Sequence, residues 1–551
     1  MNISLYSFMR FETVFLFSFV VLVNFVFIFI SSKDFYSKLL SYKNKFNTKN
    51  LFSTIPTLTK NLKDNDNVKQ TFNNFYDSYY VFFRFTNIFL LYVISLQLVS
   101  NSYYYSYITL NYGYSLHLFN ISYVYNQLIL LLFIFTLLIF KVLLKQGSIK
   151  NFEYYIGLLF FFFCLYLYVN INNILLLVFL LEVQSTVIIY LISSSFNLFK
   201  NNSLDTYTRL NSLNSQPVWY FNSLIYQFWV SFIGAVLLVY GILTLFRFAN
   251  FVEWLNLNIY FFFLTFSWYH LFSLQYLNIW LPLILGLFLK IGVVPFFFWK
   301  PEIYKNLTST ILFLYMTVYL FSLLFLFIVL FNNYFILIKE WFYFYLYIVS
   351  IITLIFISLY LYSIVEVRTF LAYSSLTHLS FVFLALSTNN YLNSSTALFY
   401  VFSYLYYMFF FFCIYFTLTR NTFWYLSDLQ YVNSNIIVSS FLVFFVGLAG
   451  IPPFLGFFSK LSVIILLIFS GDYLSGTLCL FTGFFVAFFY LQNYRFYGYQ
   501  KKYFNYRNKL VIVKNSTNLY YYLSFFIITN LLSIFFINDL FIFSNYVGFL
   551  I

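Results

Sequence analysis

The chain has few cysteines and few charged residues, and each shortage excludes some classes of protein. It holds three cysteines among 551 residues, each in an apolar run far from the others: Cys164, Cys413 and Cys479. This spacing argues against a disulfide framework or a metal site and predicts buried, inert thiols. Charged residues make up 8% of the chain, whereas a soluble domain carries about 25%. Because 63% of the residues are hydrophobic, we expect the bilayer to be the main solvent of this chain.

The motifs of redox and nucleotide sites are also missing. The sequence has no Gly-rich nucleotide loop, no Cys-x-x-Cys and no flavin or iron–sulfur motif, so we predict no cofactor and no metal in this chain. Basic residues outnumber acidic ones by 29 to 15. They gather in loops beside apolar runs, and the excess therefore predicts membrane topology rather than nucleic-acid binding.

Long apolar runs are what the chain does have. Windows of about 19 residues suit a bilayer span, and they predict an all-α polytopic membrane protein with about 14 transmembrane helices. The predicted spans are 11–31, 79–100, 127–145, 154–171, 173–194, 223–247, 276–299, 308–331, 341–364, 368–388, 395–419, 436–470, 471–493 and 519–541. The first run is too long for a signal peptide and lacks a cleavage site, so we expect a retained helix. The short apolar stretch 259–275 is assigned to a loop.

Polar segments divide the chain and predict its orientation. Loop 32–78 has eight Lys and four Asp, a net charge of +4, and loop 494–518 has six basic residues and no acid. Loops 101–126 and 389–394 contain no Asp, Glu, Lys or Arg. By the positive-inside rule the basic loops face the cytoplasm or a mitochondrial matrix, and both termini face the other side. Loop 32–78 is either a weakly selected insertion or a docking segment for a neighbouring subunit.

The expected organisation follows from these loops. It is a first transmembrane helix at 1–31, the basic matrix loop 32–78, N-terminal helices at 79–145, a helical core at 146–493, a second basic matrix loop at 494–518 and a C-terminal helix at 519–551. The chain contains 85 Phe and 56 Tyr, with abundant Ile, Asn and Lys. Codons for these residues can be AT-rich, which favours an organellar genome.

Three ionisable residues lie deep in predicted spans: Glu182, Lys290 and Lys460. Lys290 follows more than thirty residues without a formal charge. A lysine at the centre of a membrane helix costs about 2.5–3.5 kcal/mol, which favours a functional charge relay. A carboxylate nearby stabilises a buried ammonium, so we expect Glu182 and Lys290 to pair. Separating such a pair would release a proton; a static pair that fixes helix packing is the alternative.

Helix breaks are predicted beside both lysines. Pro295 removes a backbone donor five residues after the first lysine. The second break lies in 436–470, which is too long for one straight span, at Gly450, Pro452 and Pro453. Broken helices expose backbone groups that can hold water at membrane depth, and proton transfer needs water near a lysine. A kink that serves packing alone is the alternative at each break.

His378 is the other candidate for proton transfer. It lies mid-span in an apolar helix, with Ser374, Ser375 and Thr377 nearby to supply hydroxyl groups. Histidine titrates near neutral pH and can pass protons through either ring nitrogen. A histidine that is merely hydrogen-bonded in the core is the alternative.

Four segments resemble the antiporter-like subunits of proton-pumping NADH:quinone oxidoreductase, respiratory complex I. They are LEVQS (181–185), LFLKIGVVPFFFWKPEIY (287–304), RTFLAYSSLTHLSFVFLAL (368–386) and GLAGIPPFLGFFSKL (447–461). They arrive in the order and at the spacing of the family. The Glu-x-Gln-Ser and Pro-Glu-x-Tyr elements are most similar to subunit 2, because subunits 4 and 5 usually place His where this chain has Phe297 and Phe298.

The resemblance implies an antiporter-like helix bundle, spanning the core at 146–493, with broken helices near 290–301 and 450–453. It implies a membrane-arm subunit in the mitochondrial inner membrane that takes part in proton translocation, driven by NADH oxidation and quinone reduction elsewhere in the complex. Partners would include the adjacent antiporter-like subunit 4 and bound phospholipid, while FMN, iron–sulfur clusters and ubiquinone would bind other subunits. The implied relay residues are Glu182, Lys290, His378 and Lys460.

The sequence departs from the family in one predicted span. The eighth helix of the family usually carries a Lys, but 308–331 has no Lys, His, Asp or Glu, and the sixth helix also lacks its usual Lys. We expect the hydroxyls of Tyr315, Thr317 and Tyr319 to hold water that bridges the relay there. Two alternatives stay open: a structural spacer of the membrane arm that does not pump, and a related cation/proton antiporter subunit.

Overall fold

The computed structural model describes only part of the chain. The described residues are 157–165 apart from 159, 174–202, 216–250, 273–334, 339–388, 392–418, 426, 435–498 and scattered positions between 524 and 545. They divide between two compact units. The smaller includes 157–165 and 194–202, and the larger includes 174–193 and the described residues from 216 onward. The predicted helices at 11–31, 79–100 and 127–145, loop 32–78 and most of loops 259–275 and 494–518 lie outside the described residues.

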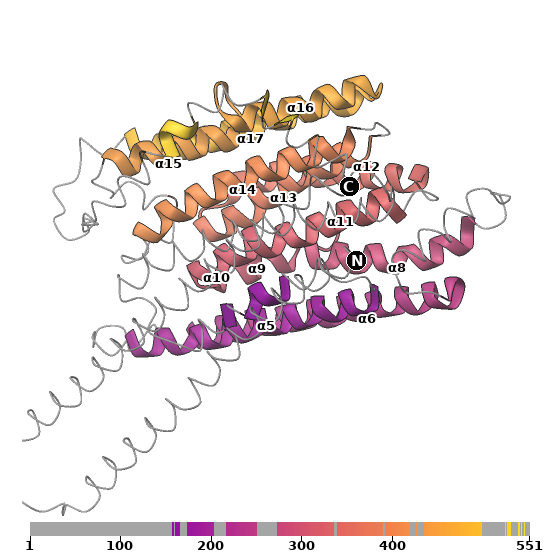
Figure 1. Ribbon diagram of the computed structural model, residues 1–551. Helices are drawn as coiled ribbons and strands as arrows, with labels where there is room; N and C mark the ends of the chain where they lie inside the picture. Colours follow the sequence, from indigo (N-terminus) through magenta and orange to yellow (C-terminus); the bar gives the residue numbers. More distant parts are fainter. Residues whose placement is uncertain are drawn as a thin grey trace, which may run out of the picture. The chain divides into compact units, whose positions relative to one another are not determined.

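The regular elements of the described residues are helices (Figure 1). In chain order they are α5 (Ile174–Asn202), α6 (Gln216–Ala249), α8 (Ser273–Ile291), α9 (Trp299–Asn306), α10 (Ser309–Leu314), the π-helix η4 (Tyr315–Tyr319), α11 (Leu320–Tyr334), α12 (Lys339–Tyr360), the 3₁₀ turn η6 (Leu361–Ser363), α13 (Val367–Leu386), α14 (Asn393–Leu418), α15 (Asn435–Ala449), α16 (Leu455–Phe469) and α17 (Tyr473–Gly498).

Seven helices among the described residues are long and apolar enough to span a membrane. A helix satisfies its backbone hydrogen bonds internally, which hydrocarbon requires. The chain is therefore a multi-pass membrane protein, and the predicted all-α class is confirmed. The total of about 14 helices stays a prediction, because it includes segments outside the described residues.

Glycines bring α6 and α8 into close contact. A Cβ atom added at Gly241 would lie 2.5 Å from the Leu283 side chain, and one at Gly286 would lie 2.8 Å from Leu238. A Cβ atom added at Gly234 would lie 3.2 Å from the Lys290 side chain. Small residues let helix backbones approach in membranes, where packing rather than hydrophobic exclusion drives association. This close contact between α6 and α8 fixes the position of α8, and with it the position of Lys290 in its last turn.

Both predicted helix breaks are confirmed, and they share one construction. Gly292 follows the last residue of α8, and Gly450 follows the last residue of α15; the φ angles of these glycines are +73° and +75°. The next residue in each case, Val293 or Ile451, donates its N–H to a carbonyl five residues earlier. A glycine in the left-handed region with such a bond is the usual way to close a helix C-terminus. After each of these glycines the chain passes through proline before the next helix begins.

The eighth predicted span is interrupted without glycine or proline. Residues Tyr315–Tyr319 form the π-helix η4 between α10 and α11, and all five side chains are buried. Inserting one residue into a helix turn widens it locally, and such turns are frequent at functional sites. In the larger unit, α13 and α14 lie side by side, with α12 against α13 and α16 against α14 (Figure 1).

Candidate functional site

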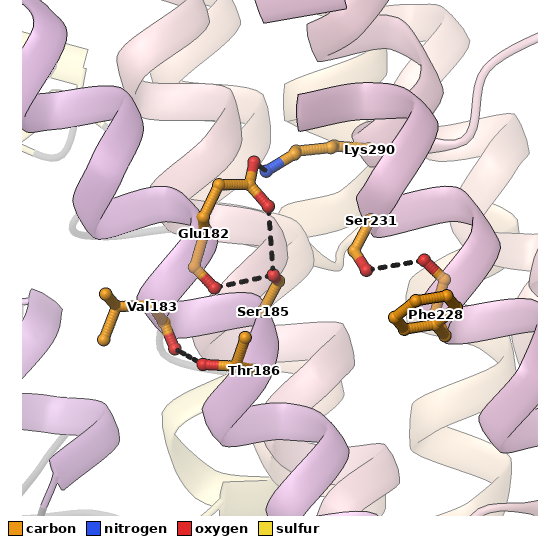
Figure 2. A network of polar contacts seen from close by, with 7 residues as sticks. All are labelled: Glu182, Val183, Ser185, Thr186, Phe228, Ser231 and Lys290. Atoms are coloured by element: carbon orange, nitrogen blue, oxygen red, sulfur yellow. Dashed lines mark hydrogen bonds and ion pairs between the residues drawn. The ribbon is translucent and has the colours of Figure 1, made fainter. Parts of the chain in front are cut away.

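Glu182 and Lys290 form an ion pair, as their burial predicted. The Lys290 Nζ atom donates to Glu182 Oε1 at 2.5 Å. Figure 2 shows the two side chains pointing toward one another from α5 and α8. The Lys290 side chain is 1% exposed and the Glu182 side chain is 26% exposed. The lysine is therefore enclosed by protein, whereas the carboxylate is partly exposed.

A serine one turn along α5 holds the carboxylate. Ser185 Oγ lies 2.7 Å from the Glu182 carbonyl oxygen and 3.3 Å from Glu182 Oε2 (Figure 2). Lys290 lies in the last turn of α8, where the helix dipole favours a positive charge. Both partners are thus oriented by their own helices, so the pair is preorganised.

Replacing Ser185 with alanine should loosen the pair without removing it. The hydrogen bond to Oε2 is long, so we expect a loss of about 0.5–1.5 kcal/mol in stability, the net value of one hydrogen bond. Thr186→Ala is the matched control, because the exposed Thr186 hydroxyl bonds only to the Val183 carbonyl. Thermal unfolding of the purified chain in detergent measures both variants. Equal melting temperatures would show that Ser185 does not support the pair.

His378 lies in a cluster of buried aromatic side chains. Its Nδ1 atom is 2.8 Å from the Tyr400 hydroxyl, and its ring centre is 4.9 Å from that of Tyr404. The His378 Nε2 atom and the Tyr404 hydroxyl are buried without a hydrogen-bond partner. The predicted hydroxyls of Ser374, Ser375 and Thr377 donate to carbonyls of their own helix. One ring nitrogen of the histidine is thus positioned by Tyr400, while the other has no hydrogen-bond partner among the described residues.

Lys460 closes the second helix break. Its Nζ atom donates to the carbonyls of Leu448 and Ala449, at 2.8 and 2.9 Å. These carbonyls belong to the last turn of α15, whose orphan acceptors need donors. The ammonium also lies 5.8 Å from the centre of the Phe381 ring. Lys460 interacts electrostatically with His378, so the structure brings these two predicted residues near one another.

The bridging hydroxyls are partly occupied by the protein itself. Thr317 Oγ1 donates to the Phe313 carbonyl at 2.6 Å, and the Tyr315 hydroxyl donates to Gln227 Oε1 at 3.1 Å. Tyr319 packs on Tyr315, with 5.0 Å between ring centres. Among the described residues, hydrogen bonds join neither Glu182 nor Lys290 to His378. The relay between these sites therefore remains a prediction.

Sequence reasoning missed Lys300. This lysine follows Trp299 at the start of α9 and is 1% exposed. Its Nζ atom donates to the carbonyl of Ile291, the residue after Lys290, at 3.2 Å. The signal was present in the sequence, because both breaks read Gly-x-x-Pro-Phe and both are followed by a lysine.

The comparison with known proteins decides the family. Residues 171–486 match the family described as NADH:quinone oxidoreductase/Mrp antiporter, TM. This region is more than half of the chain and includes all four segments on which the resemblance rested. The chain belongs to this family. No group of three or more possible metal ligands occurs among the residues that the structure describes.

Curated relatives in the family match part of the chain. NADH-quinone oxidoreductase subunit N of Francisella tularensis subsp. holarctica (strain FTNF002-00 / FTA) is 30% identical over 225 residues, 40% of this chain and 46% of the relative. The subunit N of Pelagibacter ubique (strain HTCC1062) is 28% identical over 215 residues, 38% of this chain and 45% of the relative. The chain therefore spans about half the length of the curated relatives it matches.

Solved structures share the fold. A chain of respiratory complex I from Thermus thermophilus with bound aureothin has a TM-score of 0.58 and 17% identity, over 81% of this chain and 90% of that chain. A chain of the membrane-bound sulfane sulfur reductase, an archaeal respiratory membrane complex, has a TM-score of 0.65 and 14% identity, over 84% and 91%. At these identities the likeness establishes the antiporter-like fold alone.

Proposed function

We propose that the chain is a membrane-arm subunit of a proton-translocating NADH:quinone oxidoreductase, most similar to subunit 2. The observation that carries the proposal is the Glu182–Lys290 ion pair, formed across α5 and α8 inside the region that matches the family. The curated relatives are named as subunits of NADH-quinone oxidoreductase. A buried pair of titratable groups in a membrane marks an ion or proton pathway.

The pair works as a switch between two charge states. While Glu182 touches Lys290, each charge stabilises the other. A conformational change that separates them leaves two unpaired charges in a poor solvent, and transfer of the lysine's proton to the relay removes one of these charges. His378 and Lys460 receive and pass the proton on, and their own charges interact. The helix breaks provide the polar backbone groups that such a route needs.

The energy comes from redox chemistry in other subunits. NADH oxidation, with FMN and iron–sulfur clusters, and ubiquinone reduction occur outside this chain, which contributes proton transfer. The partners are other membrane-arm subunits, including an adjacent antiporter-like subunit 4, and bound phospholipid. The chain then lies in the mitochondrial inner membrane, and the excess of basic residues in its loops 32–78 and 494–518 supports an orientation with both termini on the intermembrane-space side.

A pump-inactive spacer is the second candidate. The span formed by α10, η4 and α11 contains no Lys, His, Asp or Glu. Its Thr317 hydroxyl is bonded to its own backbone rather than left for water. A spacer would keep the ion pair as a packing element of the membrane arm.

Co-purification tests membership of the complex. An affinity tag on this chain should recover NADH:quinone oxidoreductase activity from solubilised membranes, and the specific activity should rise with each purification step. The same tag on an unrelated multi-pass protein of that membrane is the control. Recovery of the chain without NADH oxidation would refute the proposal and favour a free antiporter.

A further inference from the structure

Lys300 is the third buried lysine among the described residues, besides Lys290 and Lys460. Its side chain is enclosed at the start of α9, and among the described residues no carboxylate lies within ion-pair distance of it. Its contacts are the Ile291 carbonyl at 3.2 Å and the face of the Tyr304 ring, whose centre is 6.0 Å away. A buried charge with so few partners is costly.

The geometry of Lys300 repeats that of Lys460. Each lysine follows a break closed by a left-handed glycine, and each donates to a carbonyl at the end of the helix before the break. Each alkyl chain packs on its glycine: a Cβ at Gly292 would lie 3.3 Å from Lys300 Cδ, and one at Gly450 would lie 2.8 Å from Lys460 Cδ. The first break therefore has two lysines, one on each side, whereas the second break has one.

Helix α9, which begins beside Lys300, packs against the helix that carries His378. The Tyr304 hydroxyl, one turn along α9, is buried near the Ser375 side chain of α13. Ser375 is one turn from His378, and α9 packs against α13. The Tyr304 ring also contacts Tyr315 of η4, with 5.5 Å between centres. Lys300 thus contacts the residue after Lys290, and Tyr304 on the same helix lies between Lys300 and the His378 helix.

We propose that Lys300 is a second proton-carrying site at the first helix break, which takes the place of the lysine missing from α10–α11. The inference rests on the proposed function. The Lys290 ammonium gives a proton to the neutral Lys300 amine through intervening water or hydroxyls, so Lys290 becomes neutral and Lys300 becomes charged. Lys300 then releases one proton toward α13 by way of the Tyr304 hydroxyl. Hydroxyls bridge but do not store a proton, and Lys300 supplies the storage.

The test compares Lys300→Arg and Lys300→Gln in the intact complex, reconstituted in vesicles. Both replacements keep a donor for the Ile291 carbonyl, but arginine does not release its proton and glutamine carries no charge. We expect both variants to assemble and to lose about a hundredfold in proton-pumping rate, the lower end of the range for a lost acid–base group. Lys305→Gln is the matched control on the same helix; Lys305 is one-third exposed and paired with Glu366.

The outcomes separate the possible roles. Pumping that survives in either Lys300 variant identifies a structural cap and overturns the inference. If neither variant assembles, Tyr304→Phe decides, since it removes only the hydroxyl: slower pumping supports the route, and unchanged pumping overturns it. Lys290→Arg tests the proposed function separately. If that variant pumps normally, the proposed function fails; if it does not pump while Lys300→Gln does, only the role of Lys300 fails.

Discussion

Lys290→Met is expected to lower proton-coupled quinone reduction about a hundredfold, because it removes the acid–base group of the buried pair. The Glu182 carboxylate would lose its partner at 2.5 Å. It can take up a proton and become neutral, which limits the loss of stability. The complex should therefore assemble in near-normal amounts while its turnover falls. Quinone reduction by NADH, divided by the amount of assembled complex, measures the effect.

The pair also predicts how two substitutions combine. Glu182→Gln should cause a similar loss alone, and the double variant Glu182→Gln/Lys290→Met should be little worse than either single one. Residues that act as a unit are strongly non-additive in this way. Losses that multiply in the double variant would show that the two residues act independently, which contradicts a switch.

Gly456→Ala is expected to disrupt the second break. A Cβ at this position would lie 2.0 Å from the Gly447 carbonyl oxygen, a backbone atom that cannot rotate away. Helix α16 would have to move from α15, and the bonds from Lys460 to Leu448 and Ala449 would lengthen. Overpacking of this kind costs about 1–3 kcal/mol. Thermal unfolding in detergent should show a lower midpoint, and proton pumping should fall with it.

Gly483→Ala is the control for that substitution. Gly483 lies inside α17 with nothing within 4 Å of the added Cβ. Alanine is favoured over glycine in a helix by about 0.5–1 kcal/mol, so this variant should be as stable as the parent or slightly more so. If the two variants unfold at the same temperature, the close approach of α15 and α16 does not hold the site.

The ion pair could be predicted because the cost of a buried charge is independent of the fold. Glu182 and Lys290 are 108 residues apart, yet either one alone would be expensive in a membrane helix. The breaks could be predicted too, since Gly450 adopts a left-handed φ at little cost and the prolines remove backbone donors. Both kinds of prediction rest on properties of single residues, which can be judged before the tertiary contacts are known.

Other features depend on packing and could not be predicted. The π-helix at Tyr315–Tyr319 replaces what the sequence indicates as a plain apolar helix, with no glycine or proline to mark it. The pair between Lys305 and Glu366, at 2.9 Å, joins α9 to the residue before α13. The burial of Lys300 could not be predicted either, because it arises when α9 packs against α6 and α13. Recognising it required the repeat of the two breaks.

The Lys290→Arg variant tests directly whether Lys290 carries a proton during pumping. The measurement is the number of protons translocated per NADH oxidised, in vesicles that contain the variant complex. Arginine keeps the positive charge and can bond Glu182, but it does not give up its proton. We expect an assembled complex whose ratio of protons to NADH falls below that of the parent, measured as pH change on NADH addition with and without an uncoupler. A ratio equal to that of the parent would contradict it, because the pair would then be a packing element and the chain a spacer.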